Sequence, residues 1–185
     1  MNVLQSLYVE IERLYANKRL LELSEQWQYT IEKEKDWYLG DKSQFNFYQK
    51  EVKHKYLDHN RKVFVIISDA MRYEIGQELH DAINQRNRFK SILDYQVTGL
   101  PSYTQLGMAS LLPHEMLSFG DGDDIFIDGL VTKGLAPRKK ILTDIGKVSA
   151  TTISADELAS YKVKSEEAKA LVQNHDVVYV YHNII

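Results

Sequence analysis

The sequence predicts an α/β fold, in which a mainly parallel sheet carries helices on both faces and is preceded by N-terminal helices. Two continuous apolar runs, Val63–Ile67 and Val177–Tyr181, lack the polar–apolar alternation of a half-exposed strand. Both runs therefore indicate strands that are covered on both faces. Helix-like patterns lie between them, and strands that alternate with helices are typical of a parallel sheet. A chain of 185 residues with 44% apolar content is long enough to build one sizeable core.

The N-terminal part of the chain has a helical pattern. Residues 3–39 are predicted to be helical, because apolar side chains recur there at three- and four-residue spacing: Leu4, Leu7, Tyr8, Ile11, Leu14 and Tyr15. Gly40 followed by Asp41 indicates a helix end. A second amphipathic segment follows, with apolar side chains on one side: Phe45, Tyr48, Val52 and Tyr56. We therefore predict a helical segment over residues 1–60 and an α/β domain over residues 61–185.

The α/β domain is predicted to continue with alternating elements. In chain order we expect a helix from Met71 to about Arg86, a strand Ile92–Val97, a short helix Tyr103–Leu111, a short strand Ile125–Ile127, a strand Val148–Ile153 and a helix Ser165–Gln173. Ser165 is a good cap for the last of these helices, and the acidic residues after it suit a first helical turn.

The composition excludes several classes of function. A net charge of −3 gives no electrostatic case for general binding to nucleic acid or to a membrane surface. Cysteine is absent, which excludes disulfides and thiolate metal ligands. No apolar run reaches the roughly 18 residues that a membrane span needs. We therefore expect a cytoplasmic protein without a membrane segment.

Asp69 is the first candidate for chemistry, because it directly follows the apolar run Val63–Ile67 and Ser68. Ligands of open parallel sheets gather beyond the carboxyl ends of the strands. From its position alone, Asp69 is either the N-cap of the helix that follows or a carboxylate ligand of a hard metal ion. The local pattern leaves both alternatives open and favours the cap.

Thr104 is the second candidate, within the stretch LPSYTQLGMASLLPH at residues 100–114. Ser102 is expected to cap the short helix, whereas a hydroxyl such as that of Thr104 could attack a phosphoryl group if a metal ion lowered its pKa. His182 also stands at a strand end. The six histidines have no local metal-site spacing, and the missing glycine-rich phosphate loop disfavours a nucleotide-binding domain.

These residues resemble a known family. The stretches VFVIISDAMRYE, LPSYTQLGMASLLPH and DVVYVYHNII are similar to the PglZ domain of the alkaline phosphatase superfamily, which occurs in bacterial BREX and phage-growth-limitation defence systems. The strong similarity covers residues 62–114 and 176–185. It implies a doubly wound α/β fold with metal ions at the carboxyl ends of the strands.

The resemblance also implies roles for the two candidates. The metal-binding aspartate of the first strand corresponds to Asp69, and the hydroxyl nucleophile, which also contacts metal, corresponds to Thr104. The implied reaction is in-line attack on a phosphate ester through a phosphothreonine, with two divalent ions, zinc in relatives, stabilising the attacking and leaving oxygens. The type of phosphate-ester substrate stays open.

The sequence departs from the family pattern by ending before the later aspartate and histidine ligands. We therefore expect a fragment of a longer protein, with a domain incomplete at its C-terminus and no catalytic activity on its own. The alternative to an enzyme is a non-catalytic scaffold domain of a defence complex. In either case the resemblance implies other BREX proteins as partners, including a DNA methyltransferase, while direct nucleic-acid binding stays open.

Overall fold

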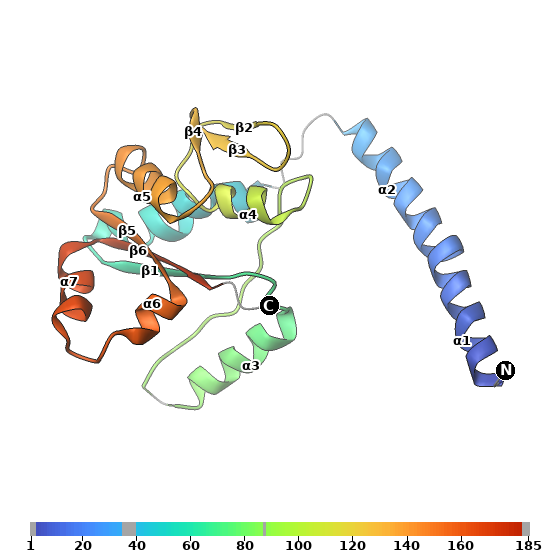
Figure 1. Ribbon diagram of the computed structural model, residues 1–185, viewed down its shortest axis with the longest axis horizontal. Helices are drawn as coiled ribbons and strands as arrows, with labels where there is room; N and C mark the ends of the chain where they lie inside the picture. The colour runs from blue at the N-terminus through green and yellow to red at the C-terminus, as the bar shows by residue number, and fades with distance from the viewer. Residues whose placement is uncertain (1–2, 35–39, 87, 183–185) are drawn as a thin grey trace. The chain divides into compact units, whose positions relative to one another are not determined.

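The computed structural model describes residues 3–34, 40–86 and 88–182 (Figure 1). The chain divides into two compact units, residues 1–38 and residues 39–185. The sequence predicts a domain boundary between residues 60 and 61. The two compact units divide earlier in the chain, so this later boundary lies within the second unit and stays a prediction.

The first unit is helical, as the sequence predicts. It consists of α1 (Val3–Leu14), a π-helical stretch η1 (Tyr15–Leu20) and α2 (Leu21–Lys33). None of the residues in these three elements is buried. Residues 35–39, which complete the predicted helical segment, lie outside the described residues.

The second unit begins with short 3-10 and π-helical elements: η2 (Gly40–Lys42), η3 (Gln44–Asn46), η4 (Tyr48–His54) and η5 (Leu57–His59). Tyr48 and Val52 lie in the core, with Phe45 packed against it. The predicted apolar side of this amphipathic segment therefore does face inward.

A parallel sheet forms the centre of the second unit. It contains β1 (Val63–Ser68), β6 (Val177–His182) and β5 (Ala150–Ser154), in the spatial order β1-β6-β5. The central strand β6 pairs in parallel with both neighbours. All three strands follow from the sequence pattern, and so does their parallel orientation.

Helices lie on both faces of this sheet (Figure 1). On one face, α4 (Thr104–Ser110) and α5 (Leu135–Asp144) contribute to the main core, together with the odd-numbered residues of β1 and β6. On the other face, α6 (Ala155–Ser160) and α7 (Glu166–Asn174) cover the side chains of Ile153, Val178 and Val180. Ser165 caps α7 as predicted, because its hydroxyl oxygen accepts a hydrogen bond from the Ala168 N–H at 3.3 Å.

The second face of β1 lacks such a cover among the described residues. Phe64 is 41% exposed and Ile66 is 66% exposed, although they pair in register with the buried Val178 and Val180. The prediction of a strand covered on both faces is therefore correct for β6 but wrong for β1. The helix α3 (Tyr73–Asn84), which follows β1, buries Gly76 alone among its residues.

A small antiparallel sheet was not predicted. Its strands are β2 (Leu117–Phe119), β3 (Ile125–Ile127) and β4 (Leu130–Val131). The strand expected at Ile125–Ile127 is confirmed, but it pairs with β2 and β4 and not within the parallel sheet. Strands this short give a weak signal, so the sequence pattern found β3, whose three residues are all apolar, and missed β2 and β4.

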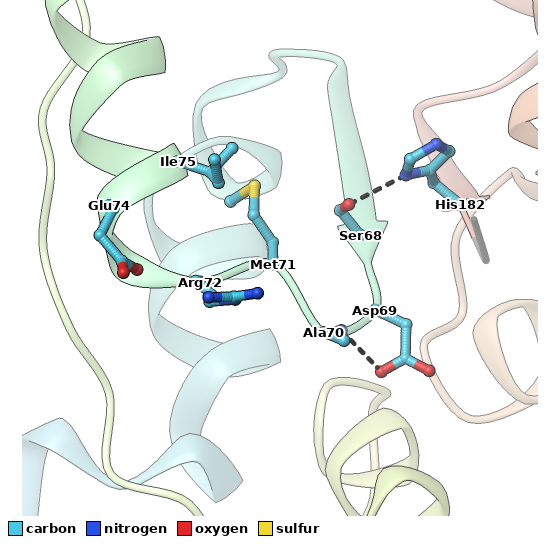
Figure 2. Close-up of a pocket in the computed structure, with 8 residues that line it drawn as sticks. All are labelled: Ser68, Asp69, Ala70, Met71, Arg72, Glu74, Ile75 and His182. Carbon is cyan, nitrogen blue, oxygen red and sulfur yellow. Dashed lines mark hydrogen bonds between the residues drawn. The ribbon is translucent and has the colours of Figure 1, made fainter. Parts of the chain in front are cut away.

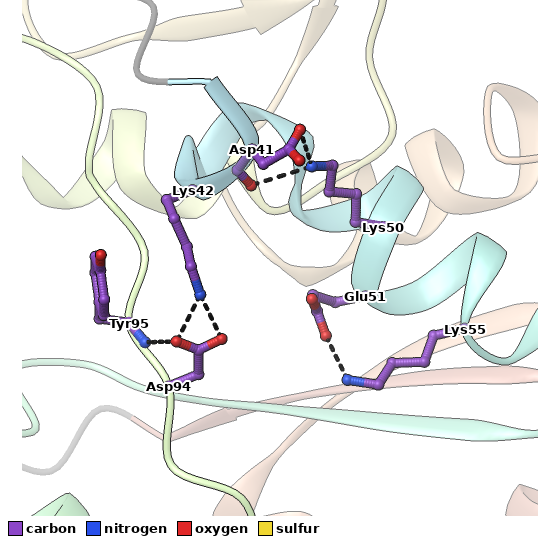
Figure 3. A network of polar contacts seen from close by, with 7 residues as sticks. All are labelled: Asp41, Lys42, Lys50, Glu51, Lys55, Asp94 and Tyr95. Atoms are coloured by element: carbon purple, nitrogen blue, oxygen red, sulfur yellow. Dashed lines mark hydrogen bonds and ion pairs between the residues drawn. The ribbon is translucent and has the colours of Figure 1, made fainter.

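The strand expected at Ile92–Val97 is wrong. The segment makes one isolated bridge, between Val97 and Ser43, and Ile92 is 89% exposed. Figure 3 shows what holds the segment beside η2: Lys42 Nζ donates to both carboxylate oxygens of Asp94 at 2.6 Å. A segment with a strand-like sequence forms a strand only where a partner strand is in reach, and this segment bonds to the helical turns around Lys42 and Gln44 instead.

No helix in the described part of the chain is long and apolar enough to cross a membrane.

Candidate functional site

Asp69 lies at the carboxyl end of β1, as the sequence predicts. Its N–H donates to the carbonyl of His182 at 3.1 Å, which extends the β1–β6 ladder by one bond beyond the strand. Its side-chain Oδ1 accepts a hydrogen bond from the Ala70 N–H at 3.0 Å. Ala70 has a φ of 54°, a left-handed conformation that turns the chain sharply after the strand.

The alternative role of Asp69 as a helix cap is wrong. The N-cap of α3 is Arg72, which makes no side-chain capping bond, and the helix begins at Tyr73. Asp69 is therefore too far upstream to satisfy the N–H groups of the first turn. Its carboxylate instead fixes the turn at Ala70, which leaves the second oxygen available to a ligand.

A cavity of about 600 Å³ opens beside this strand end, between β1 and the start of α3 (Figure 2). The residues that line it are Ser68, Asp69, Ala70, Met71, Arg72, Glu74, Ile75 and His182. The lining combines apolar side chains with a carboxylate, a guanidinium and an imidazole, a mixture that suits a small charged ligand.

Ser68 and His182 form a polar pair at the ends of neighbouring strands. They occupy equivalent positions in the β1–β6 register, and Ser68 Oγ lies 2.9 Å from His182 Nδ1. This bond fixes the imidazole ring and leaves Nε2 for another partner. The sequence indicated His182 because it ends an apolar run, but local sequence gave no sign that Ser68 would be its partner.

The Asp69 carboxylate and the His182 ring point in different directions in Figure 2. Side chains alternate between the faces of a strand, so Asp69 follows Val65 and Ile67 toward the face that carries the main core. Ser68 and His182 belong to the other face, with Phe64 and Val180. The strand end thus presents different chemistry on its two sides.

Thr104 is the first residue of α4, and its side chain is exposed. The helix buries Leu106, Met108 and Ala109 in the same core cluster that contains Val65 of β1. Thr104 and Asp69 therefore belong to the same side of the sheet. Thr104 is not among the described residues that line the cavity beside Asp69, and no hydrogen bond joins the two side chains within the described parts of the chain.

The cap expected for α4 is wrong, because Tyr103 and not Ser102 is its N-cap, without a side-chain capping bond. The Tyr103 N–H donates to the carbonyl of Pro101 at 3.1 Å, so the backbone itself shapes the approach to the helix. The structure shows no capping bond from the hydroxyl of Ser102 or of Thr104. Capping therefore does not prevent the Thr104 hydroxyl from reacting.

A metal site would need more ligands than the described residues bring together. Asp69 fits as a ligand, since its half-buried carboxylate stands at a strand end with one oxygen outside the Ala70 hydrogen bond. Within residues 3–34, 40–86 and 88–182, however, no group of three or more histidine, aspartate or glutamate side chains could hold an ion. A divalent ion needs four or more ligands, so this set does not complete a metal site.

An open parallel sheet with a carboxylate at the end of its first strand and a hydroxyl on the same side defines a class of α/β proteins that bind ligands at the strand ends. The chain belongs to the PglZ family, described as the BREX system PglZ alkaline phosphatase-like domain, which matches residues 47–185. The resemblance seen in the sequence is thereby confirmed.

Two curated relatives match nearly the whole chain. Alkaline phosphatase-like protein BrxZ of Escherichia coli O9:H4 (strain HS) is 41% identical over 190 residues, covering 99% of this chain and 21% of that protein. Alkaline phosphatase-like protein PglZ of Bacillus cereus (strain H3081.97) is 31% identical over 179 residues, covering 95% of this chain and 20% of that protein. The chain thus spans about a fifth of the length of these relatives. No solved structure gives a significant match.

Proposed function

We propose that the full-length protein containing this chain is a metal-dependent phosphoric-ester hydrolase of a bacterial anti-phage defence system. Thr104 is its nucleophile, and Asp69 is one of its metal ligands. The observation that carries the proposal is the position of these two side chains: a carboxylate at the end of β1 and an exposed hydroxyl at the start of α4, on the same side of the sheet.

The chemistry assigned to this chain is a transfer of the phosphoryl group. Thr104 Oγ1 attacks phosphorus, the bond from phosphorus to the ester oxygen breaks, and the alcohol leaves with a proton. Water then attacks the phosphorylated Thr104, which restores the hydroxyl and releases inorganic phosphate from a monoester substrate or a monoester from a diester substrate. Bound divalent ions, for which we propose zinc, would supply Lewis-acid stabilisation of the attacking and leaving oxygens.

Asp69 contributes a fixed negative charge to such a site. The Ala70 N–H holds Oδ1, and the ladder bond to His182 holds the backbone at the strand end. A ligand whose position is fixed before the ion binds loses little conformational entropy on binding. The remaining ligands are proposed to come from other parts of the longer protein.

The test uses the full-length protein with zinc or manganese and with monoester and diester substrates. Thr104→Ala should lower turnover by about a thousandfold or more, while the neighbouring control Ser102→Ala should retain it. Asp69→Asn should lower the amount of metal bound per molecule, measured by elemental analysis, whereas Asp81→Asn on the exposed side of α3 should not.

A trapping experiment separates the nucleophile from a residue that only shapes the site. Acid quenching during turnover should yield a phosphorylated peptide that contains Thr104, and Thr104→Ala should abolish it. If the Thr104 and Asp69 variants match the wild type in turnover and metal content, the assignment is wrong. The alternative, a non-catalytic scaffold domain, would then be the better account.

The partners are proposed from the defence system that the family description names. We propose that the full-length protein acts in the cytoplasm beside other BREX proteins, including a DNA methyltransferase, with a phosphate ester of still undefined type as substrate. Co-purification of the tagged full-length protein with the other proteins of the system, before and after phage infection, tests the partners. Recovery of the tagged protein without any of them under both conditions would contradict this part of the proposal.

A further inference from the structure

The short helix η3 holds α4, the helix that begins at Thr104. Gln44 Nε2 of η3 donates to the carbonyl of Gly107 in α4 at 3.3 Å. The next residue, Phe45, meets the ring of His114 edge-on, with the ring centroids 6.2 Å apart. Two neighbouring residues of η3 therefore contact the first turn of α4 and the segment just after the helix.

The backbone of Gln44 is fixed to the segment that leads into α4. The Gln44 N–H donates to the Val97 carbonyl at 2.9 Å, and the Val97 N–H donates to the Lys42 carbonyl at 2.8 Å. Gly99, two residues further along, lies so close to the Phe45 ring that an added Cβ would collide with it. Residues 42–45 therefore hold α4 and the approach to it in one fixed arrangement.

The side chain of Gln44 does not suit a purely structural role. Its Nε2 has a partner, but its Oε1 is buried and has no hydrogen-bond partner among the described residues. A buried carbonyl oxygen that loses water without gaining a donor lowers stability. A methionine has about the same length and carries no such oxygen, so it would fill this place with less loss of stability. Stability alone therefore does not explain an amide at this position.

We propose that Gln44 is a positioning residue, whose amide fixes the first turn of α4 and with it the Thr104 hydroxyl. This role rests on the proposed function, in which Thr104 is the nucleophile. An attacking oxygen must be held close to phosphorus and in line with the leaving oxygen, and a displacement of about 1 Å can lower the rate about 100-fold. The Thr104 side chain is exposed, so the position of its hydroxyl depends on how α4 is held.

The other contacts that hold α4 act further from Thr104 or without a preferred direction. The Tyr179 hydroxyl donates to the carbonyl of Leu111, which lies beyond the end of the helix. Buried side chains such as Leu106 pack into the core, but apolar contact is non-directional. The hydrogen bond from Gln44 has a preferred angle, so it fixes the orientation of the turn that carries Thr104.

The catalytic test uses the full-length protein with zinc or manganese and with monoester and diester substrates. Gln44→Met should lower kcat about 10- to 100-fold and leave KM within about twofold, because it removes a contact that matters for the attack and not for substrate binding. Gln44→Glu should lower kcat further, because a carboxylate oxygen then faces the Gly107 carbonyl. The matched control Gln49→Met, at an exposed glutamine of η4, should keep the wild-type kcat.

A second measurement on the full-length protein is independent of catalysis. The Gly107 N–H donates to the Tyr103 carbonyl at 3.0 Å in the first turn of α4. Hydrogen exchange of this amide should be about 10-fold faster in Gln44→Met than in the wild type. The Tm of Gln44→Met should be equal to or higher than that of the wild type, because the buried oxygen without a partner is gone. Gln49→Met should change neither quantity.

Three results would overturn the positioning role. A wild-type kcat in Gln44→Met would show that the amide does not position Thr104. A raised KM with an unchanged kcat would place Gln44 in substrate binding. A lower kcat together with a lower Tm and unchanged exchange in α4 would indicate a general loss of structure.

Failure of the proposed function gives a different result. The wild-type protein would then show no turnover and no phosphorylated Thr104, so there would be no nucleophile for Gln44 to position. The exchange of the Gly107 amide would still differ between Gln44→Met and Gln49→Met, because the hydrogen bond from η3 to α4 exists whether or not Thr104 reacts.

Discussion

β1 and β6 are neighbouring parallel strands of similar composition, VFVIIS and VVYVYH, but their surroundings differ. On the face where α6 and α7 lie, Val178 and Val180 of β6 are each 1% exposed, while their register partners Phe64 and Ile66 are 41% and 66% exposed. The difference comes from the neighbouring elements and not from the strands themselves. The apolar sequence of a strand indicates which side chains are expected to be buried. Whether they are buried depends on the helices and strands that lie beside the strand in the fold.

The largest expected effect is a loss of stability at alkaline pH, caused by tyrosines that are buried in the covered part of the molecule. Burial raises the pKa of Tyr48 and of Tyr181 to about 12, and it raises the pKa of Tyr179 well above its usual value. A tyrosine in an unfolded chain titrates near a pH of about 10. Above that pH the unfolded state releases protons that the folded state keeps, so stability falls.

The chain should therefore be fully stable below pH 10 and lose its fold as the pH approaches 12. Urea unfolding followed by circular dichroism across this range measures the loss. Tyr48→Phe should move the loss to higher pH, whereas Tyr95→Phe, at a residue that is 64% exposed, should not. A stability that is flat between pH 9 and pH 12 would show that these hydroxyls are not buried.

The next largest effect is expected from truncating matched residues on the two strands. Val180→Ala should lower the free energy of unfolding of the chain by about 2 kcal/mol, because it opens a cavity under α6 and α7. Ile66→Ala, at the register partner, should change it by less than about 0.5 kcal/mol. Urea titrations of both variants measure the difference. Equal losses would mean that β1 is already covered in the chain itself.

A smaller effect is expected from a buried hydrogen bond of β6. The Tyr179 hydroxyl donates to the carbonyl of Leu111 at 2.7 Å and connects the central strand to the residue after α4. Tyr179→Phe leaves that carbonyl unpaired and should cost about 1.5 kcal/mol. Tyr73→Phe removes the same hydroxyl from a residue of α3 that is 68% exposed and should leave the free energy of unfolding unchanged. A loss in Tyr73→Phe as large as in Tyr179→Phe would contradict the comparison.

The contrast between β1 and β6 also explains which parts of the fold the sequence could predict. Periodicity and continuous apolar runs located β1, β5 and β6, because burial selects for them over five or six residues. The same reasoning placed a strand at Ile92–Val97, where the residues are suitable but none of the described strands pairs with them. Pairing is a property of the tertiary structure, and local sequence does not contain it.

The candidate site also has features that the sequence could predict and features that it could not. The position of Asp69 at the end of β1 was predictable, because a polar residue directly after an apolar run is expected at the carboxyl end of a strand, where ligands of open parallel sheets gather. The bond between Ser68 and His182 was not predictable, because it depends on the register between strands that are 114 residues apart. The helix boundary also had to come from the structure: the start of α3 at Tyr73 removes the capping role that spacing alone favoured for Asp69.

The smallest of these effects is expected at the helix ends. On the covered side, Ser165 caps α7 through the Ala168 N–H, and Ser165→Ala should lower the free energy of unfolding by about 1 kcal/mol. On the bare side, the N-cap of α3 is Arg72, which makes no capping bond, so Arg72→Ala should cost nothing measurable. Arg72→Ser should even stabilise α3, because a serine hydroxyl can accept from the N–H groups of the first turn. Thermal unfolding of the three variants measures these differences. A loss in Arg72→Ala that matches Ser165→Ala would show that Arg72 stabilises the start of α3 by contacts other than a cap.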